Sequence, residues 1–330
     1  MATEIPTVKL ASGYDMPIVG FGIWKVPNEA AADQVYNAIR LGYRHIDGAW
    51  DYTNSAEAGK GVRRAIEEGI VKREEMFITS KLWNNYHARE HALEMARLEN
   101  EAWGLGYLDL FLIHFPISLE FIPFDKIRFP CFWSDKEQTQ VTPLVKVPIS
   151  ETWKALEELV QTRENPSGFV RSIGISNFDP QLISDLLSYA KIHPSVLQIE
   201  HHPYLTQQDL VALAHENNIA VTGYSTFGPQ SFLEMDNATA KAAKPLFEND
   251  VVKSIAQKHG KSPGQVLLRW CTQRNIIVIP KSNSVERLKQ NLECCSFDLD
   301  EDEIKQISAL NLNLRFNNPN TLGRPIRIFS

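Results

Sequence analysis

The fold is decided by three stretches of the sequence, GYRHID (42–47), FITSK (77–81) and LDLFLIH (108–114). Each is a short apolar run of β type that ends in a polar side chain, Asp47, Lys81 or His114. Later runs end in the same way, at Asn177, Gln198, Tyr224 and Lys281. In an eight-fold βα barrel the C-terminal ends of the strands meet at one mouth, where such enzymes carry out their chemistry. The sequence therefore predicts one site that is assembled from the whole length of the chain.

Segments with helical character lie between most of these runs. We expect strands near residues 19–21, 44–47, 77–81, 108–114, 170–176, 196–200, 220–224 and 276–280. We expect helices near residues 29–41, 56–68, 88–103, 150–160, 180–189, 207–217, 263–273 and 285–292. Strands that alternate with helices in this way predict the α/β class, as a closed (β/α)8 TIM barrel. Two short runs, 7–10 and 16–19, flank Gly13 and predict an N-terminal β-hairpin.

The chain has 330 residues, of which 43% are hydrophobic and 22% charged, so we expect a single domain over residues 1–330. Two long connections, 117–147 and 226–250, leave the expected catalytic face, and 311–330 forms a C-terminal tail. Long loops on that face are commonly functional. The first connection is rich in aromatic residues that favour a packed lid: Phe121, Phe124, Phe129, Phe132 and Trp133.

Composition argues against several classes of partner. The formal net charge is -6, without the basic stripe that a phosphate backbone requires, so nucleic acid is not expected. No stretch approaches the roughly 20 apolar residues that span a bilayer, and the N-terminus lacks the apolar core of a secretory signal. The four cysteines have no spacing that suits zinc, so we expect reduced thiols, no metal and a cytoplasmic protein.

The polar residues at the strand ends suit the reduction of a carbonyl group. Tyr52 can give a proton to a developing alkoxide, but the usual pKa of a tyrosine, about 10, is high for acid catalysis near neutrality. A buried Lys81 is expected to lower that pKa, and Asp47 to keep the lysine charged. His114 can orient the substrate oxygen. Each residue alone is weak support, since a histidine in an apolar run is often a core residue and a strand-end lysine often lies in solvent.

Ten segments spread along the chain resemble one known family. They are MPIVGFGIWKV (16–26), GYRHIDGAWDYTNSAEAGKGV (42–62), FITSKLWN (77–84), YLDLFLIHFPI (107–117), RSIGISNF (171–178), LQIEHHPYL (197–205), GYSTFGPQSFLE (223–234), GKSPGQVLLRW (260–270), IPKSNSVERLKQNL (279–292) and LRFNNP (314–319). In these segments the chain is similar to the aldo-keto reductases, and among them to fungal NAD(P)H-dependent D-xylose reductases. The resemblance implies a (β/α)8 barrel that binds NADPH in extended form, with Tyr52 as general acid, Lys81 and Asp47 as its tuning pair, and His114 as orienting residue.

The resemblance also implies residues that hold the cofactor. Ser176, Asn177 and Gln198 would hold the nicotinamide carboxamide, and Tyr224 would stack on the ring. Further positions are implied for the pyrophosphate, the adenosine ribose, the adenosine phosphate and the adenine: Ser225, Phe227, Glu234, Lys281, Ser282, Asn283, Arg287, Gln290 and Asn291. Because no G-x-G-x-x-G follows a strand, binding would not be of the Rossmann type. Lys281 and Arg287 would lie near a helix start, which suits a phosphate, although a solvated basic helix start remains the alternative. NADPH is the expected cofactor, with some use of NADH.

The resemblance places the substrate against Trp24, Asp51, Phe115 and Asn317, a mixture of apolar walls and hydrogen-bonding groups that suits a polyol-like aldehyde. The expected reaction is the reduction of an aldose, D-xylose to xylitol. The chain departs from the family's pattern at 127–133, at Thr53 where glycine is usual, and at Asn318 where aspartate is usual. The alternative is therefore a pathway-specific reductase of a bulkier aldehyde, ketone or imine. A monomer and a homodimer both remain open, and so does a barrel that binds nucleotide without turnover.

Overall fold

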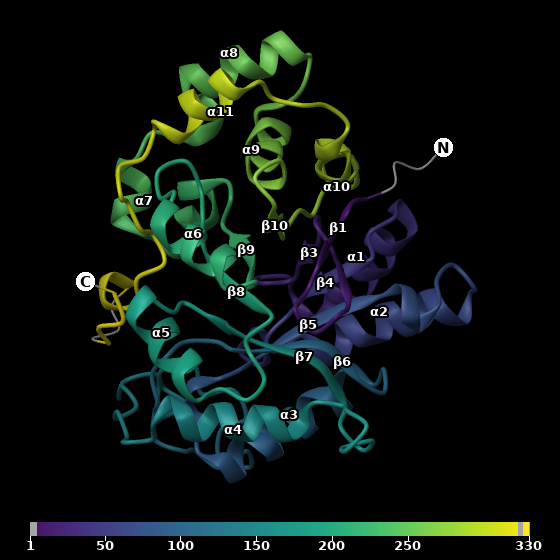
Figure 1. Cartoon of the computed structure of the whole chain (residues 1–330), viewed down its shortest axis with the longest axis vertical. Helices are drawn as coiled ribbons and strands as arrows, with labels where there is room; N and C mark the ends of the chain where they lie inside the picture. Colours follow the sequence, from purple (N-terminus) through teal and green to yellow (C-terminus); the bar gives the residue numbers. More distant parts are fainter. Residues whose placement is uncertain (1–4, 323–325, 330) are drawn as a thin grey trace.

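Parallel strands occupy the centre of the protein and helices surround them (Figure 1). This computed structural model describes residues 5–322 and 326–329. Residues 323–325 and 330 of the expected tail, and residues 1–4, lie outside the described residues. The strands of the sheet are β3 (Phe21–Gly22), β4 (His45–Asp47), β5 (Phe77–Leu82), β6 (Leu108–Ile113), β7 (Val170–Ser176), β8 (Val196–Glu200), β9 (Ala220–Tyr224) and β10 (Ile276–Val278). Their order in the sheet follows the sequence.

The residues just before β3 close the sheet into a barrel. Val19 and Val278 form a parallel bridge. The Gly20 N–H donates to the Val278 carbonyl at 2.8 Å, and the Val278 N–H donates to the Ile18 carbonyl at 2.9 Å. Phe21 and Gly22 then pair with β4. The first strand is thus shared between its two neighbours, β10 and β4, and the predicted (β/α)8 barrel is confirmed.

The eight expected helices are present, with ends that differ from the predicted ones by a few residues. They are α1 (Asn28–Leu41), α2 (Ser55–Glu67), α3 (Arg89–Trp103), α4 (Ile149–Leu159), α5 (Pro180–Tyr189), α6 (Gln208–Glu216), α9 (Pro263–Thr272) and α10 (Val285–Leu292). Helix α9 shows why the local sequence folds in this way. Ser262 and Gln265 form a reciprocal capping box, and Pro263 occupies the first turn, where its missing N–H costs nothing.

Three further helices were not expected from the sequence: α7 (Ala238–Ala242), α8 (Asp250–His259) and α11 (Glu301–Ser308). Helices α8 and α11 pack against each other outside the ring of barrel helices (Figure 1). The sequence does carry their signals. Asn249 caps the start of α8 and Gly260 ends it with φ of 61°, while Asp300 and Glu303 form the capping box of α11.

Short 3-10 turns fill several of the connections. They are η1 (Trp50–Tyr52), η2 (Arg73–Glu75), η3 (Asn84–Tyr86), η4 (Gly228–Met235), η5 (Leu246–Glu248), η6 (Glu293–Cys295) and η7 (Pro319–Leu322). The connection 226–250 is therefore mostly helical, with η4, α7 and η5 in succession. The N-terminal hairpin is β1 (Thr7–Lys9) paired with β2 (Asp15–Pro17), and Ser12 in its turn contacts Ser172 near the start of β7. The hairpin thus lies at the end of the barrel opposite the strand termini that carry the site.

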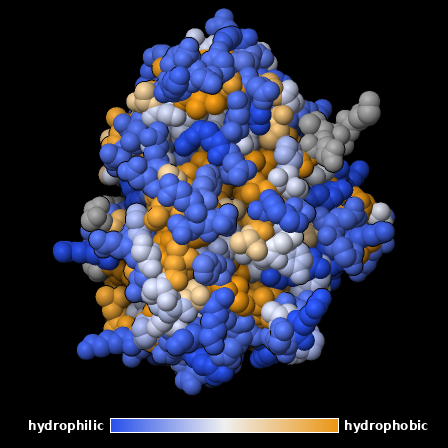
Figure 2. All heavy atoms as spheres, viewed as in Figure 1, coloured by the Kyte–Doolittle hydropathy of each residue, from blue (hydrophilic) through white to orange (hydrophobic). Residues whose placement is uncertain are grey.

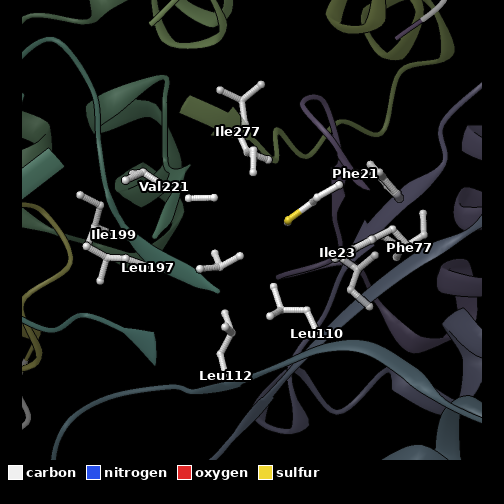
Figure 3. Packing of buried hydrophobic residues seen from close by; sticks show 14 of the residues in the cluster. Phe21, Ile23, Phe77, Leu110, Leu112, Leu197, Ile199, Val221 and Ile277 are labelled. Carbon is white, nitrogen blue, oxygen red and sulfur yellow. The ribbon is translucent and has the colours of Figure 1, made fainter. Parts of the chain in front are cut away.

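The hydrophobic core surrounds the barrel strands. Strands β5, β6 and β8 are buried along their whole length, which explains their nearly continuous apolar sequences. Figure 3 shows core side chains from opposite sides of the barrel, with Phe21 and Ile23 on one side and Leu197 and Val221 on the other. Hydrophilic residues cover most of the face seen in Figure 2, and hydrophobic residues gather in narrower strips between them.

Candidate active site

A cleft of about 740 Å³ opens at the C-terminal ends of the strands. It brings together residues from Gly22 near the start of the chain to Pro319 near its end. Twenty of the 21 site residues expected from the sequence line this cleft. The exception, Lys81, is fully buried directly beneath it. A barrel accounts for this convergence, because every strand delivers its last residues to the same mouth.

Three of the expected catalytic residues form one contact group. The Lys81 Nζ donates to Asp47 Oδ1 at 2.6 Å and to the Gly48 carbonyl at 2.7 Å. It also lies 3.4 Å from the Tyr52 hydroxyl. Lys81 and Asp47 are both sealed from solvent, with side-chain exposures of 0% and 1%. Lys81 is therefore no solvent lysine, and its charge is matched inside the protein.

The fourth residue, His114, packs beside the tyrosine. Its ring lies edge-on to the Tyr52 ring, with 5.8 Å between the ring centroids. The imidazole also contacts Trp83, and Phe115 stacks on it. His114 Nδ1 is buried and has no hydrogen-bond partner within the described protein. The histidine thus belongs to the wall of the cleft and not only to the core.

Burial controls the protonation of the group. Burial raises the pKa of Tyr52 well above its usual value near 10, and the negative charge of Asp47 acts in the same direction. The net shift is therefore upward in the ligand-free protein, and the lowering of this pKa by Lys81 stays a prediction. Burial also lowers the pKa of His114 well below 6.5, with a further contribution from Lys81. Near neutral pH Tyr52 holds its proton and His114 is neutral, so both side chains can act as hydrogen-bond donors.

A polar network joins the strand ends next to this group. Gln198 Nε2 donates to Asp47 Oδ2 at 2.8 Å. Asn177, held in a left-handed conformation with φ of 63°, donates to the His114 carbonyl at 2.9 Å and accepts from the Tyr224 hydroxyl at 2.7 Å. Ser176 Oγ donates to the Gln198 carbonyl at 2.8 Å. Hydrogen bonds within the protein thus hold Ser176, Asn177, Gln198 and Tyr224 in place.

The far end of the cleft is basic. Lys281 and Arg287 line it around the start of α10, and Arg287 Nε donates to Ser282 Oγ at 3.2 Å. The remaining positions expected for the adenosine half also line the cleft here: Asn283, Gln290 and Asn291. A helix start with two cations beside it suits a phosphate.

One cation of the cleft was missed from the sequence. Lys25 donates from Nζ to the Ser231 carbonyl at 2.6 Å, and its Nζ lies 3.4 Å from Glu234 Oε2. The contact joins the loop after β3 to η4 across the cleft. Burial lowers the pKa of Lys25, Glu234 opposes the shift, and the positive charge of Lys281 adds to it. The two lysines line the same cleft, and their mutual repulsion would be relieved by a bound anion. In the sequence, Lys25 directly follows Trp24 after the first strand.

The substrate end of the cleft combines polar and aromatic groups. Trp24, Asp51, Phe115 and Asn317 line it as expected, and so does Trp83, which was not expected from the sequence. Of the three aromatic residues in the divergent stretch 127–133, Phe132 lines the cleft, and Phe129 and Trp133 do not. Phe129 instead packs on Trp50, with 5.0 Å between the ring centroids. Phe121 and Phe124 contact Tyr86, so the segment 117–147 packs onto the barrel wall.

The departure at Thr53 has a structural meaning. Thr53 follows η1 with φ of 64°, a left-handed conformation in which a residue with a branched Cβ is strained and glycine is not. The glycine that is usual in the resemblance is therefore the residue that this turn favours. The side chain of Thr53 is exposed and does not line the cleft.

A parallel barrel whose mouth holds a buried Asp–Lys–Tyr group, a neutral histidine and an elongated cleft with a basic end has the form of a nucleotide-dependent oxidoreductase. The chain belongs to the aldo/keto reductase family, whose sequence model matches residues 18–312. A family of this kind takes a small carbonyl compound as substrate. Among the helices of the described residues, none has the length and apolar character to cross a membrane.

Relatives with known names cover almost the whole chain. It is 62% identical over 323 residues to an NAD(P)H-dependent pentose reductase of Pyricularia oryzae, an alignment that spans 98% of each protein. It is 56% identical over 324 residues to a probable NAD(P)H-dependent D-xylose reductase of Emericella nidulans, covering 98% of this chain and 99% of that one.

Solved structures give the same result for the fold. The aldose reductase of Schistosoma japonicum superposes with a TM-score of 0.83 at 34% identity, covering 97% of this chain and 96% of that one. The aldo-keto reductase of Bombyx mori, solved in complex with NADP, superposes with a TM-score of 0.82 at 32% identity and 97% coverage of both chains.

Proposed function

We propose that the protein is an NADPH-dependent aldose reductase that converts D-xylose to xylitol, with NADH as a second cofactor. The observation that carries this proposal is the Tyr52–Lys81–Asp47 group, which opens beside His114 into a cleft whose substrate end holds Asp51 and Asn317. The names of the relatives, a pentose reductase and a D-xylose reductase, support the choice of sugar.

The residues of the cleft fit an extended dinucleotide. The polar network of Ser176, Asn177 and Gln198 suits the carboxamide, and Tyr224 would stack on the ring. Ser225 and Phe227 would line the pyrophosphate, with Lys25 beside it, and Glu234 would reach the adenosine ribose. Lys281, Ser282, Asn283 and Arg287 would hold the adenosine phosphate, with Gln290 and Asn291 at the adenine. The bound cofactor supplies a hydride to the carbonyl carbon.

The chain's own residues complete the reaction. Tyr52 donates its hydroxyl proton to the carbonyl oxygen, for which its raised pKa keeps it loaded at neutral pH. The ammonium of Lys81, at 3.4 Å, stabilises the phenolate as it forms, and Asp47 keeps that ammonium charged. His114, held neutral, donates a hydrogen bond to the same oxygen and fixes its direction. A proton from water then restores Tyr52.

The remaining expectations belong to the same proposal. We propose a cytoplasmic enzyme of one domain that acts on a small molecule and has no nucleic-acid partner. Whether the enzyme is a monomer or a homodimer can be determined by light scattering after size-exclusion chromatography.

The test of the sugar uses Asn317→Ala. If Asn317 binds a substrate hydroxyl, this variant loses roughly tenfold or more of kcat/KM for D-xylose and keeps its kcat/KM for propanal, which has no hydroxyl to bind. Asn320→Ala, an exposed neighbour outside the cleft, is the matched control. Equal losses on both aldehydes would remove Asn317 from the sugar site.

A second candidate, a reductase of a bulkier aldehyde, ketone or imine, is favoured by one observation. Phe132 lies in the cleft wall against Trp83, with 5.0 Å between their ring centroids. On this alternative the wild type uses benzaldehyde well and every pentose poorly, and Phe132→Ala damages only the aromatic reaction. NADPH oxidation measured with D-xylose, L-arabinose and benzaldehyde decides between the two. Negligible activity on all pentoses would leave only the family assignment.

A further inference from the structure

The C-terminal tail crosses the mouth of the barrel along a fixed path. The Tyr204 carbonyl accepts the N–H groups of Leu312 at 3.1 Å and Leu314 at 2.9 Å. Beyond them, Phe316 is fully buried, with its ring against His202 and Phe232. The tail therefore reaches the substrate end of the cleft by a series of anchors and not as a free strand.

The last anchor before the cleft is a carboxylate. Glu200 ends strand β8 and has no exposed surface. Its Oε1 accepts the Phe316 N–H at 2.8 Å, and its Oε2 accepts the Asn317 N–H at 2.9 Å. His202 Nε2 donates to Oε1 as well, at 2.9 Å. One buried side chain thus holds two successive backbone amides of the tail.

An ionised carboxylate is suited to this position for a physical reason. Both of its oxygens accept hydrogen bonds, so both N–H groups are satisfied at once, and hydrogen bonds to a charged acceptor are the stronger kind. A glutamine of the same size would keep one oxygen and turn an NH2 group toward the other amide. The tail would then lose the contact at Phe316 or at Asn317.

The anchored residue is also the one that enters the cleft. Asn317 Nδ2 donates to the Tyr224 hydroxyl at 2.9 Å, and that hydroxyl donates to Asn177 at 2.7 Å. The carboxylate of Glu200 therefore fixes the backbone of Asn317 on one side, while Tyr224 fixes the side chain on the other. Small movements of the tail would change where the Asn317 amide meets a substrate.

We propose that Glu200 is a positioning residue for substrate selectivity, which holds the tail so that Asn317 can bind a hydroxyl of a polyhydroxy aldehyde. The proposal rests on the function proposed above. It assigns Glu200 no contact with substrate, cofactor or the reacting atoms. Its effect is therefore expected in the choice between substrates, and not in the proton transfer itself.

The variant Glu200→Gln tests the proposal. We expect the KM for D-xylose to rise and kcat/KM for D-xylose to fall roughly tenfold, while kcat/KM for propanal and the Kd for NADPH stay near the wild-type values. Losses of equal size on both aldehydes would mean a purely structural role and would overturn the proposal.

A matched control exists at the connection that leads into β8. Glu157 of α4 also accepts two successive backbone N–H groups, those of Lys191 at 2.7 Å and Ile192 at 2.9 Å. Glu157 does not line the cleft. Both N–H groups bind the same oxygen, Oε1, which a glutamine would keep. Glu157→Ala is therefore the change that removes this anchor, and we expect it to leave the ratio of D-xylose to propanal activity unchanged.

A double-mutant cycle separates positioning from general damage. In an Asn317→Ala background, Glu200→Gln should change the D-xylose to propanal ratio by less than twofold, because no amide is left to position. Additive losses would overturn the proposal.

Hydrogen exchange separates this proposal from the proposed function. The backbone amides of Phe316 and Asn317 should exchange slowly in the wild type and faster in Glu200→Gln. This measurement needs no substrate, so it does not depend on which aldehyde the enzyme reduces. If the wild type lacks pentose activity but the amides respond, the assigned substrate fails and the tail anchor stands. If the amides are unchanged, the anchor fails.

Discussion

Lys81 Nζ and Asp47 Oδ1 lie 2.6 Å apart in a part of the barrel that solvent does not reach. Burial lowers the pKa of Lys81, and the charge of Asp47 opposes that shift. The pair is thus kept ionised by its own attraction. Its position explains how a charged group can act on the Tyr52 hydroxyl from within an apolar barrel.

The loss of one member of the pair should be costly. Lys81→Met leaves Asp47 as an unpaired buried charge, so we expect the free energy of unfolding to fall by about 3 kcal/mol or more, together with loss of turnover. Urea denaturation measures the first effect. The double variant Lys81→Met/Asp47→Asn, which removes the stranded charge, should recover part of the stability without recovering activity. A stable, active Lys81→Met protein would refute the role of the pair.

Tyr52→Phe should remove nearly all carbonyl reduction, because it deletes the proton donor and little else. The binding of NADPH, followed by quenching of intrinsic fluorescence, should stay close to that of the wild type. Tyr189→Phe, in α5 and outside the cleft, serves as the control and should keep full turnover. If Tyr52→Phe turned over near the wild-type rate, another residue would have to be the general acid.

Arg287→Ala should raise the KM for NADPH by roughly tenfold to a hundredfold and change that for NADH little, since only NADPH carries a 2′-phosphate with which the guanidinium can pair. Steady-state kinetics with each cofactor measures both values. Lys289→Ala removes an exposed charge from the same helix outside the cleft and should leave both unchanged. If Arg287→Ala raised the KM for both cofactors equally, Arg287 would not be the residue that binds the 2′-phosphate of NADPH.

Thr53→Gly should stabilise the protein by about 1 kcal/mol. The left-handed conformation costs a residue with a Cβ about 1–2 kcal/mol, and the greater freedom of unfolded glycine offsets about half of the gain. The same substitution at Thr7, in strand β1, should have the opposite sign because that backbone is extended. Chemical denaturation of both variants measures whether the free energy of unfolding rises or falls. A Thr53→Gly protein less stable than the wild type would argue against backbone strain at Thr53.

Acid should destabilise the fold through its buried histidines. Burial lowers the pKa of His45 from 6.5 to about 4 and that of His87 to about 3. Between pH 6.5 and 4 the unfolded chain therefore binds protons that the folded chain does not, so the free energy of unfolding falls as the pH falls. Each such group contributes about 1.4 kcal/mol per pH unit. Denaturation series at pH 6.5, 5.5 and 4.5 should show a smaller slope for His87→Asn than for the wild type, and an unchanged slope would argue against a buried neutral His87.

Local pattern determined most of the fold and the polar strand ends that form the catalytic group. Apolar runs that end in Asp47, Lys81 and His114 predict buried strands with polar ends. This prediction needs only neighbouring residues, because the hydrophobic pattern of a strand is local. The helices α8 and α11 were missed although their caps were readable at Asn249 and Asp300. The resemblance to the family supplied the cofactor and substrate positions, and the prediction of one domain stays a prediction.

Only the tertiary structure decided which distant residues meet. The barrel closes through hydrogen bonds that join Ile18 and Gly20 to Val278, and Glu200 anchors Asn317. Both contacts join residues more than a hundred positions apart. The local sequence pattern cannot predict such contacts. The high pKa of Tyr52 also belongs to the folded state, because it arises from burial that the three-dimensional packing creates. The sequence by itself determined which elements form and what chemistry their ends carry. The closed barrel set the distances between the site side chains, the directions in which they point and their removal from solvent.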